Sequence, residues 1–142
     1  MPKTYRVAVI GRSSTVGRPL ALLLSARGES GDATVTLAHS RTPRLADALA
    51  GSDIIVSCAG VPGLVQRGVA PKGSIVVDVG LSSVADSSTP SGFRAVGDAD
   101  AASLEGWAEA LTPVPGGLGP VTAAQLTWNV VEGWRRQVGG GS

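Results

Sequence analysis

Short runs of apolar, β-branched residues alternate with helical segments along most of the chain, and this alternation restricts the fold more than any other feature. The expected strands cover 6–10, 33–38, 53–57 and 74–79, and the expected helices cover 16–27 and 43–50. Three of the strands are almost continuously apolar, which is typical of parallel strands covered on both faces. A strand–helix–strand order favours right-handed crossover connections. The sequence therefore predicts an α/β fold, a doubly wound and mostly parallel sheet with helices on both faces.

The last third of the chain gives weaker signals. Residues 85–92 read as a polar loop, 93–96 as a brief strand and 120–137 as a final helix with one apolar stripe. A chain of 142 residues fits one domain of ordinary size. We expect a single domain over 1–138 and a flexible glycine-rich tail over 139–142.

Charge and cysteine content exclude several classes of function. Twelve Lys and Arg residues stand against eleven Asp and Glu residues, without a basic block, so neither nucleic acid nor a membrane surface is an expected partner. Cys58 is the only cysteine, and no cluster has metal-ligand spacing, so we expect no disulfide and no metal. A single cysteine and an N-terminus that does not resemble a signal peptide lead us to expect a cytoplasmic location.

A glycine-rich turn follows the first strand and precedes the first helix. Gly11, Ser13, Val16 and Gly17 form this turn, although Ser13 stands where a dinucleotide-binding motif usually has its middle glycine. Glycines there allow close backbone approach to a pyrophosphate, and the helix N-terminus offers free N–H groups. The turn therefore predicts a Rossmann-like dinucleotide site, with a ligand-free turn as the alternative.

The end of the second strand indicates which dinucleotide binds. A site for NAD usually places an acidic residue there, facing the ribose 2′-hydroxyl, but this chain has His39, Ser40 and Arg41. Together with Arg12, these groups suit a 2′-phosphate, because guanidinium groups form paired hydrogen bonds with phosphate. We therefore expect NADP or NADPH as the cofactor, unless the arginines are only solvated surface charges.

Three later loops complete the expected site. The small turn after the third strand and the end of the fourth strand would lie at the carboxyl edge of the sheet, where ligands bind in such folds. Their expected cofactor-binding residues are Cys58, Ala59, Gly60, Pro62, Asp78 and Gly80. A proline- and glycine-rich loop precedes the final helix, and its fixed shape predicts a wall of the substrate cleft. Its expected substrate-binding residues are Pro113, Val114, Pro115, Gly116 and Gly117.

Together these segments resemble the NAD(P)-binding domain of the methylenetetrahydrofolate dehydrogenase/cyclohydrolase family, which serves one-carbon metabolism. The resemblance runs from about Val7 to about Glu132 and follows several motifs in one order. The motifs are 9–13 with 16–19, 33–36 with 39–42, 46–53, 60–63, 77–80, 96–98 and 112–122. The resemblance implies a domain that binds NADP(H) and forms a homodimer, with the loop over 113–119 on the substrate side.

The family's enzymes also carry a catalytic lysine and tyrosine in a separate N-terminal domain. This chain begins at the first strand of the cofactor domain, and Lys3, Lys72 and Tyr5 stand in no comparable motif. We therefore expect a stand-alone domain that does not follow the usual folate mechanism. The polar groups expected at the cleft as candidate catalytic residues are Asp98, Thr122 and Gln125. Each also has a structural interpretation, such as a helix cap at Asp98.

Three functions remain open on the sequence. The first is an NADP-dependent oxidoreductase that transfers hydride to or from a small iminium or other C=N substrate. The second is a cofactor-free cyclase or isomerase of a biosynthetic pathway that uses the same cleft, since an inherited fold does not fix function. The third is a subunit that supplies NADP to a separate catalytic polypeptide.

Overall fold

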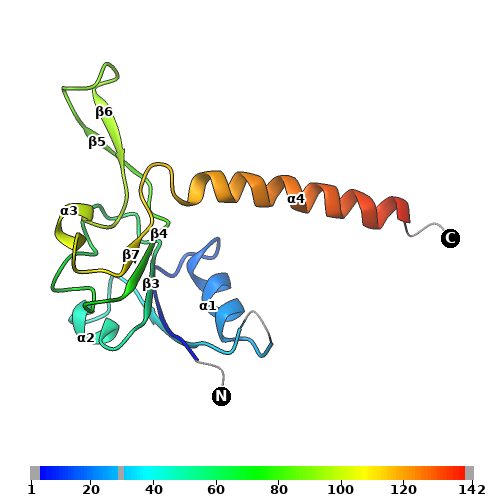
Figure 1. Cartoon of the computed structure of the whole chain (residues 1–142), viewed down its shortest axis with the longest axis horizontal. Helices are drawn as coiled ribbons and strands as arrows, with labels where there is room; N and C mark the ends of the chain where they lie inside the picture. Colours follow the sequence, from blue (N-terminus) through cyan, green and yellow to red (C-terminus); the bar gives the residue numbers. More distant parts are fainter. Residues whose placement is uncertain (1–3, 29–30, 140–142) are drawn as a thin grey trace.

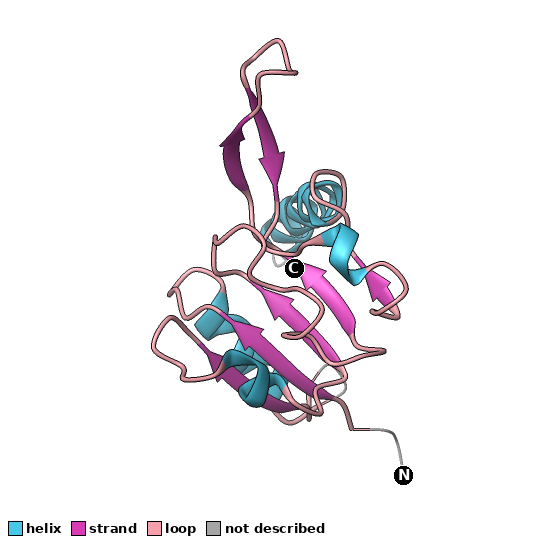
Figure 2. Ribbon diagram, turned by 90° about the vertical axis from the view of Figure 1, so that its left-hand side faces the viewer, coloured by secondary structure: helices cyan, strands magenta, loops and turns pink. Residues whose placement is uncertain are grey.

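A five-stranded parallel sheet forms the centre of the computed structural model, which describes residues 4–28 and 31–139. Its strands are β1 (Arg6–Ile10), β2 (Thr34–Ala38), β3 (Ile54–Ser57), β4 (Ile75–Asp78) and β7 (Ala110–Leu111). They lie in the order β2-β1-β3-β4-β7 and all pair in parallel (Figure 2). The chain thus adds β2 on one side of β1 and β3 on the other, which confirms the predicted doubly wound sheet.

The helices cover both faces of this sheet, as predicted. Successive strand residues point to opposite faces, so β1 contributes Val7 and Val9 to one core cluster and Ala8 and Ile10 to the other. Helix α1 (Gly17–Ser25) packs on the first cluster through Leu20, Ala21 and Leu24. Helices α2 (Leu45–Leu49) and α3 (Ala101–Leu104) pack on the second, with Leu49, Ile55 and Leu104 fully buried or nearly so.

Two short elements between β4 and the last helix were not predicted as such. Helix α3 has four residues and β7 has two, and neither is long enough to show a hydrophobic period. The N-cap of α3 is Asp100, whose side chain accepts a hydrogen bond from the Ser103 N–H at 3.2 Å. The suggestion that Asp98 caps this helix is therefore wrong, because Asp98 turns inward.

A hairpin projects from the carboxyl edge of the sheet (Figures 1 and 2). It consists of the antiparallel strands β5 (Ser82–Ala85) and β6 (Phe93–Val96). The predicted strand over 93–96 is confirmed, whereas the expected loop over 85–92 is shorter because Ala85 still pairs with Phe93. The side chain of Phe93 is exposed at the hairpin.

Helix α4 (Leu118–Gly139) extends away from the body of the domain (Figure 1). None of its residues is buried, and the stripe of Leu126, Val130 and Trp134 is exposed throughout. The packing that stabilises this helix within the described chain is thus confined to its first turns. Gly139 closes the helix, and residues 140–142 of the expected tail lie outside the described residues.

Within 4–28 and 31–139, no helix combines the length and the hydropathy needed to cross a membrane.

Candidate functional site

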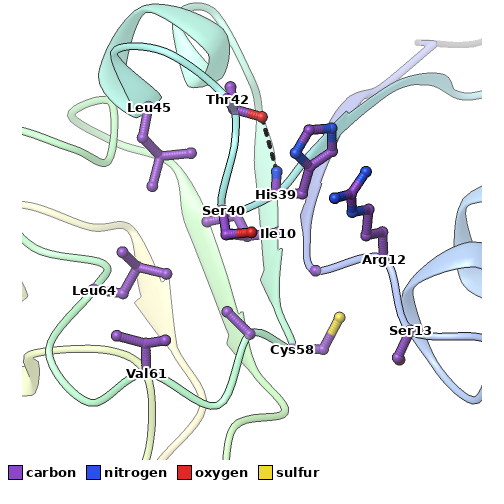
Figure 3. A pocket seen from close by; sticks show the side chains of 12 residues that line it. Ile10, Arg12, Ser13, His39, Ser40, Thr42, Leu45, Cys58, Val61 and Leu64 are labelled. Atoms are coloured by element: carbon purple, nitrogen blue, oxygen red, sulfur yellow. Dashed lines mark hydrogen bonds between the residues drawn. The ribbon is translucent and has the colours of Figure 1, made fainter.

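The ends of β1, β2 and β3 meet around a cavity of about 390 Å³ (Figure 3). It lies where the chain order reverses between β1 and its two neighbours, the position at which open parallel sheets bind ligands. Its volume falls in the range of about 300–1,000 Å³ that small-molecule sites occupy. The lining residues are Ile10, Gly11, Arg12, Ser13, His39, Ser40, Thr42, Leu45, Cys58, Ala59, Val61 and Leu64.

The turn after β1 is closed by direct packing of backbone on backbone. Gly11 adopts a φ of 123°, and a Cβ atom there would lie 2.6 Å from the Cys58 carbonyl oxygen. A Cβ atom on Gly17 would overlap the Gly11 carbonyl oxygen. These glycines therefore allow β1, β3 and the start of α1 to approach one another, in addition to leaving room for a ligand.

Ser13 holds the entry to α1. Its hydroxyl accepts hydrogen bonds from the Val16 N–H at 3.2 Å and the Gly17 N–H at 3.4 Å. A hydroxyl in this position satisfies N–H groups at the start of the helix. A serine can therefore stand where the usual motif has glycine, because its hydroxyl accepts these hydrogen bonds within the turn and the residue still lines the cavity.

The loop after β2 is fixed by its own side chains and presents the polar residues His39, Ser40 and Thr42 to the cavity. The His39 N–H donates to Thr42 Oγ1 at 2.9 Å, and the Arg41 N–H donates to His39 Nδ1 at 3.1 Å. The neutral imidazole therefore carries its proton on Nε2. Figure 3 shows the Arg12 side chain, from the turn after the neighbouring strand β1, pointing toward this imidazole. Arg12, His39 and Ser40 thus form a polar end of the cavity suited to an anion.

Cys58 lies at the floor of the cavity, at the end of β3. Burial raises the pKa of its thiol, and the negative charge of Asp98 raises this pKa further. The thiolate is the reactive form, so the pKa shift makes this cysteine slow to react. In a titration of iodoacetamide alkylation, the rate for Cys58 should rise at a higher pH than for a free thiol such as glutathione. A profile that coincides with that of glutathione would contradict this expectation, and the urea-unfolded chain serves as the control.

A second cavity, of about 470 Å³, opens between the end of β4 and the loop before α4. All five expected substrate-binding residues from Pro113 to Gly117 line it, together with Asp78, Gly80, Leu81 and Thr122. The Val114–Pro115 peptide bond in this loop is cis. The proline- and glycine-rich loop therefore forms the wall of a second groove that begins at the neighbouring strand end.

The three candidate catalytic residues occupy different environments. Asp98 is fully buried, and its carboxylate accepts one hydrogen bond from the Ser57 hydroxyl at the end of β3 and three from backbone N–H groups of the segment that follows. Thr122 lines the second cavity, and its hydroxyl donates to the Leu118 carbonyl at 2.9 Å. Gln125 is exposed on α4 and donates to Asn129. Thr122 and Gln125 also share a shallow groove on the surface of α4, whereas Asp98 lies in the interior, so the three do not form one constellation.

The expected cofactor-binding residues lie at one edge of the sheet, but the structure divides them between two cavities, which the sequence did not reveal. Seven of them line the first cavity: Gly11, Arg12, Ser13, His39, Ser40, Cys58 and Ala59. Asp78 and Gly80 line the second. Val16, Gly17, Arg41, Gly60 and Pro62 belong to the same turns but line neither cavity.

The first cavity also contains apolar residues that were not singled out, namely Ile10, Leu45, Val61 and Leu64, and the polar Thr42. Ile10, Thr42 and Val61 fall within the motifs that carry the family resemblance, whereas Leu45 and Leu64 give no signal beyond lying near the strand ends in the sequence. Apolar walls with a few convergent polar groups are typical of sites for the flat rings of small molecules.

A parallel sheet with this turn, this switch point and this basic end defines a dinucleotide-binding domain of the Rossmann class. The model of the tetrahydrofolate dehydrogenase/cyclohydrolase family, NAD(P)-binding domain, matches residues 2–138. The chain belongs to this family, which confirms the resemblance carried by its motifs.

Relatives with established names extend this comparison. The bifunctional protein FolD 2 of Haloarcula marismortui is 45% identical over 133 residues, which cover 94% of this chain and 44% of the relative. The cytoplasmic C-1-tetrahydrofolate synthase of Schizosaccharomyces pombe is 46% identical over 124 residues, covering 87% of this chain and 13% of that protein.

A solved structure, the Trypanosoma brucei N5,N10-methylenetetrahydrofolate dehydrogenase-cyclohydrolase, was complexed with NADP and an inhibitor. It superimposes with a TM-score of 0.85 at 45% identity, over 94% of this chain and 44% of that one. The chain therefore spans less than half the length of these relatives.

Proposed function

We propose that this chain binds NADP(H) in the first cavity and takes part in hydride transfer to or from a carbon–nitrogen double bond. The observation that carries the proposal is the meeting of three strand ends around one cavity, with Arg12 and Ser40 at its polar end. The Trypanosoma brucei relative, which binds NADP, supports the choice of cofactor.

The described residues fit such a cofactor. Gly11 and Gly17 pack so closely against neighbouring backbone that neither position has room for a side chain. Without side chains to cover it, the backbone of this turn is accessible to a pyrophosphate. Arg12, after β1, and Ser40, after β2, offer donors for a 2′-phosphate, and Arg41 follows Ser40 in the loop after β2. Asp32 precedes β2 and so lies away from the ribose end of the site.

The chain's contribution to the reaction is binding and orientation. When bound, NADPH supplies the hydride chemistry itself. The groove lined by Pro113–Gly117 and Thr122 would hold the substrate beside the cofactor. An iminium carbon accepts hydride without an acid, so proximity and orientation are the main requirements of the step.

The apolar face of α4 favours a second form of this function, in which the chain supplies NADP to another polypeptide. Trp134 and Val130 are 61% and 64% exposed on a helix without buried residues. Large apolar groups aligned on one exposed helix face usually mark a contact with protein.

We also propose a homodimer and a cytoplasmic location. The projecting hairpin of β5 and β6 has outer edges that are not paired within the described chain, and it exposes Phe93. Unpaired strand edges readily pair with another chain. The cytoplasmic relative from Schizosaccharomyces pombe, together with a lone reduced cysteine, supports the location.

The experiment is a hydride-transfer assay in both directions, with NADPH on a panel of iminium compounds and with NADP⁺ on methylenetetrahydrofolate. If the chain is an oxidoreductase alone, NADPH should be consumed in step with reduced product. If it is a cofactor-supplying subunit, turnover should require a second polypeptide. Protection of Cys58 from iodoacetamide by NADPH is the control for occupancy of the first cavity. Full protection without hydride transfer under either condition would contradict the proposal.

A further inference from the structure

A buried carboxylate organises the wall of the first cavity from behind. Asp98 is fully buried, and its Oδ2 atom accepts hydrogen bonds from Ser57 Oγ at 2.7 Å, the Ala59 N–H at 2.8 Å and the Gly60 N–H at 3.2 Å. Its Oδ1 atom accepts from the Val61 N–H at 2.8 Å. One side chain thus binds three backbone N–H groups within three consecutive residues, the same segment that lines the cavity through Ala59 and Val61.

A second buried carboxylate holds the first in place. Asp78, at the end of β4, accepts from the Asp98 N–H at 3.0 Å, the Gly80 N–H at 2.9 Å and the Ala99 N–H at 2.8 Å. The packing around the pair is tight: a Cβ atom on Gly80 would overlap the Asp98 carboxylate, and one on Gly97 would overlap that of Asp78. The donors around the two carboxylates are backbone N–H groups and one hydroxyl.

From this arrangement we infer that Asp98 is a positioning residue, which fixes the turn 59–61 as the wall of the cofactor cavity while Asp78 supports it. The inference rests on the proposed function only for the identity of the ligand. A carboxylate suits this task because it is acceptor-only when ionised, and each of the donors that it faces needs an acceptor in the interior. An asparagine at this position would keep the shape of the side chain but not its charge, and its NH₂ group would face one of the N–H donors of the turn.

The exchange Asp98→Asn isolates this role. The amide nitrogen would take the Oδ1 position, because Oδ2 has three donors and Oδ1 has one. The Val61 N–H would then face an NH₂ group, and the wall that Val61 forms would shift. Since hydrogen bonds to charged groups are stronger than neutral ones, we expect NADPH to bind at least about tenfold more weakly. Asp100→Asn is the matched control, because Asp100 caps α3 and asparagine caps helices equally well.

The test combines amide hydrogen exchange, alkylation and NADPH titration. In the natural chain and in Asp100→Asn, the amides of Ala59, Gly60 and Val61 should be protected from exchange. In Asp98→Asn they should exchange at least tenfold faster, while the amides of β1 and β3 remain protected. Removing the charge should also shift the alkylation profile of Cys58 to lower pH, because the Asp98 carboxylate raises that thiol pKa. These two readouts need no cofactor, so they remain decisive if NADPH does not bind.

Unchanged exchange at 59–61 in a folded Asp98→Asn variant would overturn the inference, as would faster exchange at 59–61 with natural NADPH affinity. If Asp98→Asn does not fold, Ser57→Ala takes its place, since it removes one donor and keeps the carboxylate. Faster exchange at Ala59 and NADPH affinity reduced about two- to fivefold would support the inference. Natural values for both quantities in Ser57→Ala would overturn it.

Discussion

Replacing Gly17 with alanine is expected to destabilise the fold by about 3 kcal/mol and to abolish NADPH binding, because overpacking a closed backbone contact has a cost of this order. A Cβ atom at this position would overlap the Gly11 carbonyl oxygen, which belongs to the backbone and cannot rotate away. The start of α1 would have to move off β1, and the turn that lines the cofactor cavity would open.

Thermal and urea unfolding measure this effect, with a fall in Tm of about 10 °C expected for a chain of this size. The control is Gly133→Ala in the exposed part of α4, where nothing lies within 4 Å of the added methyl group. Alanine there should leave the fold intact and stabilise the helix by roughly 0.5–1 kcal/mol. Equal stability and equal NADPH affinity for Gly17→Ala and the natural chain would show that the turn is not the close contact described.

Replacing Arg12 with alanine should weaken NADPH binding by about ten- to hundredfold, because a charge-assisted hydrogen bond to phosphate contributes about 1.5–3 kcal/mol. Arg12 lies at the polar end of the cavity beside Ser40 and His39 (Figure 3). NADH lacks the 2′-phosphate, so its affinity should stay within about twofold of the natural value. The variant should therefore lose most of its selectivity for NADPH over NADH, while its affinity for NADH changes little.

Calorimetric titration of Arg12→Ala with each cofactor measures this selectivity. Arg94→Ala is the matched control: it removes the same charge from the exposed hairpin, where Arg94 pairs only with Asp86 within the described chain. An equal loss of NADPH and NADH affinity in Arg12→Ala would mean that Arg12 supports the shape of the turn and does not recognise the phosphate.

The sheet was predictable because its strands are short, apolar and separated by helical patterns of ordinary length. β1 and β3 carry almost only apolar side chains, and burial on both faces leaves that pattern in the sequence. The elements α3 and β7 left no such pattern, since a single helical turn and a two-residue strand are fixed by tertiary contacts alone. The exposure of α4 was not predictable either. Its apolar stripe predicts that one helix face packs against protein, but it does not tell whether that protein is this domain or another chain.

The candidate site was predictable in so far as strand ends share one edge of a sheet. The turn of Gly11, the loop of His39 and Ser40, and the floor at Cys58 converge for that reason. The role of Asp98 was not predictable, because a lone aspartate after a strand gives no sign of whether it faces the cleft or the interior. Its hydrogen bonds to the turn 59–61 depend on a contact across about forty residues of sequence.

The measurement that tests the central claim most directly is a calorimetric titration of the natural chain with NADPH and with NADH. The account predicts saturable binding of NADPH with one site per chain, and at least about tenfold weaker binding of NADH, as expected for charged recognition of the 2′-phosphate. Equal affinity for both cofactors would contradict the assignment of Arg12 and Ser40 to the phosphate. No binding of either would contradict the claim that the cavity at the ends of β1, β2 and β3 is a dinucleotide site.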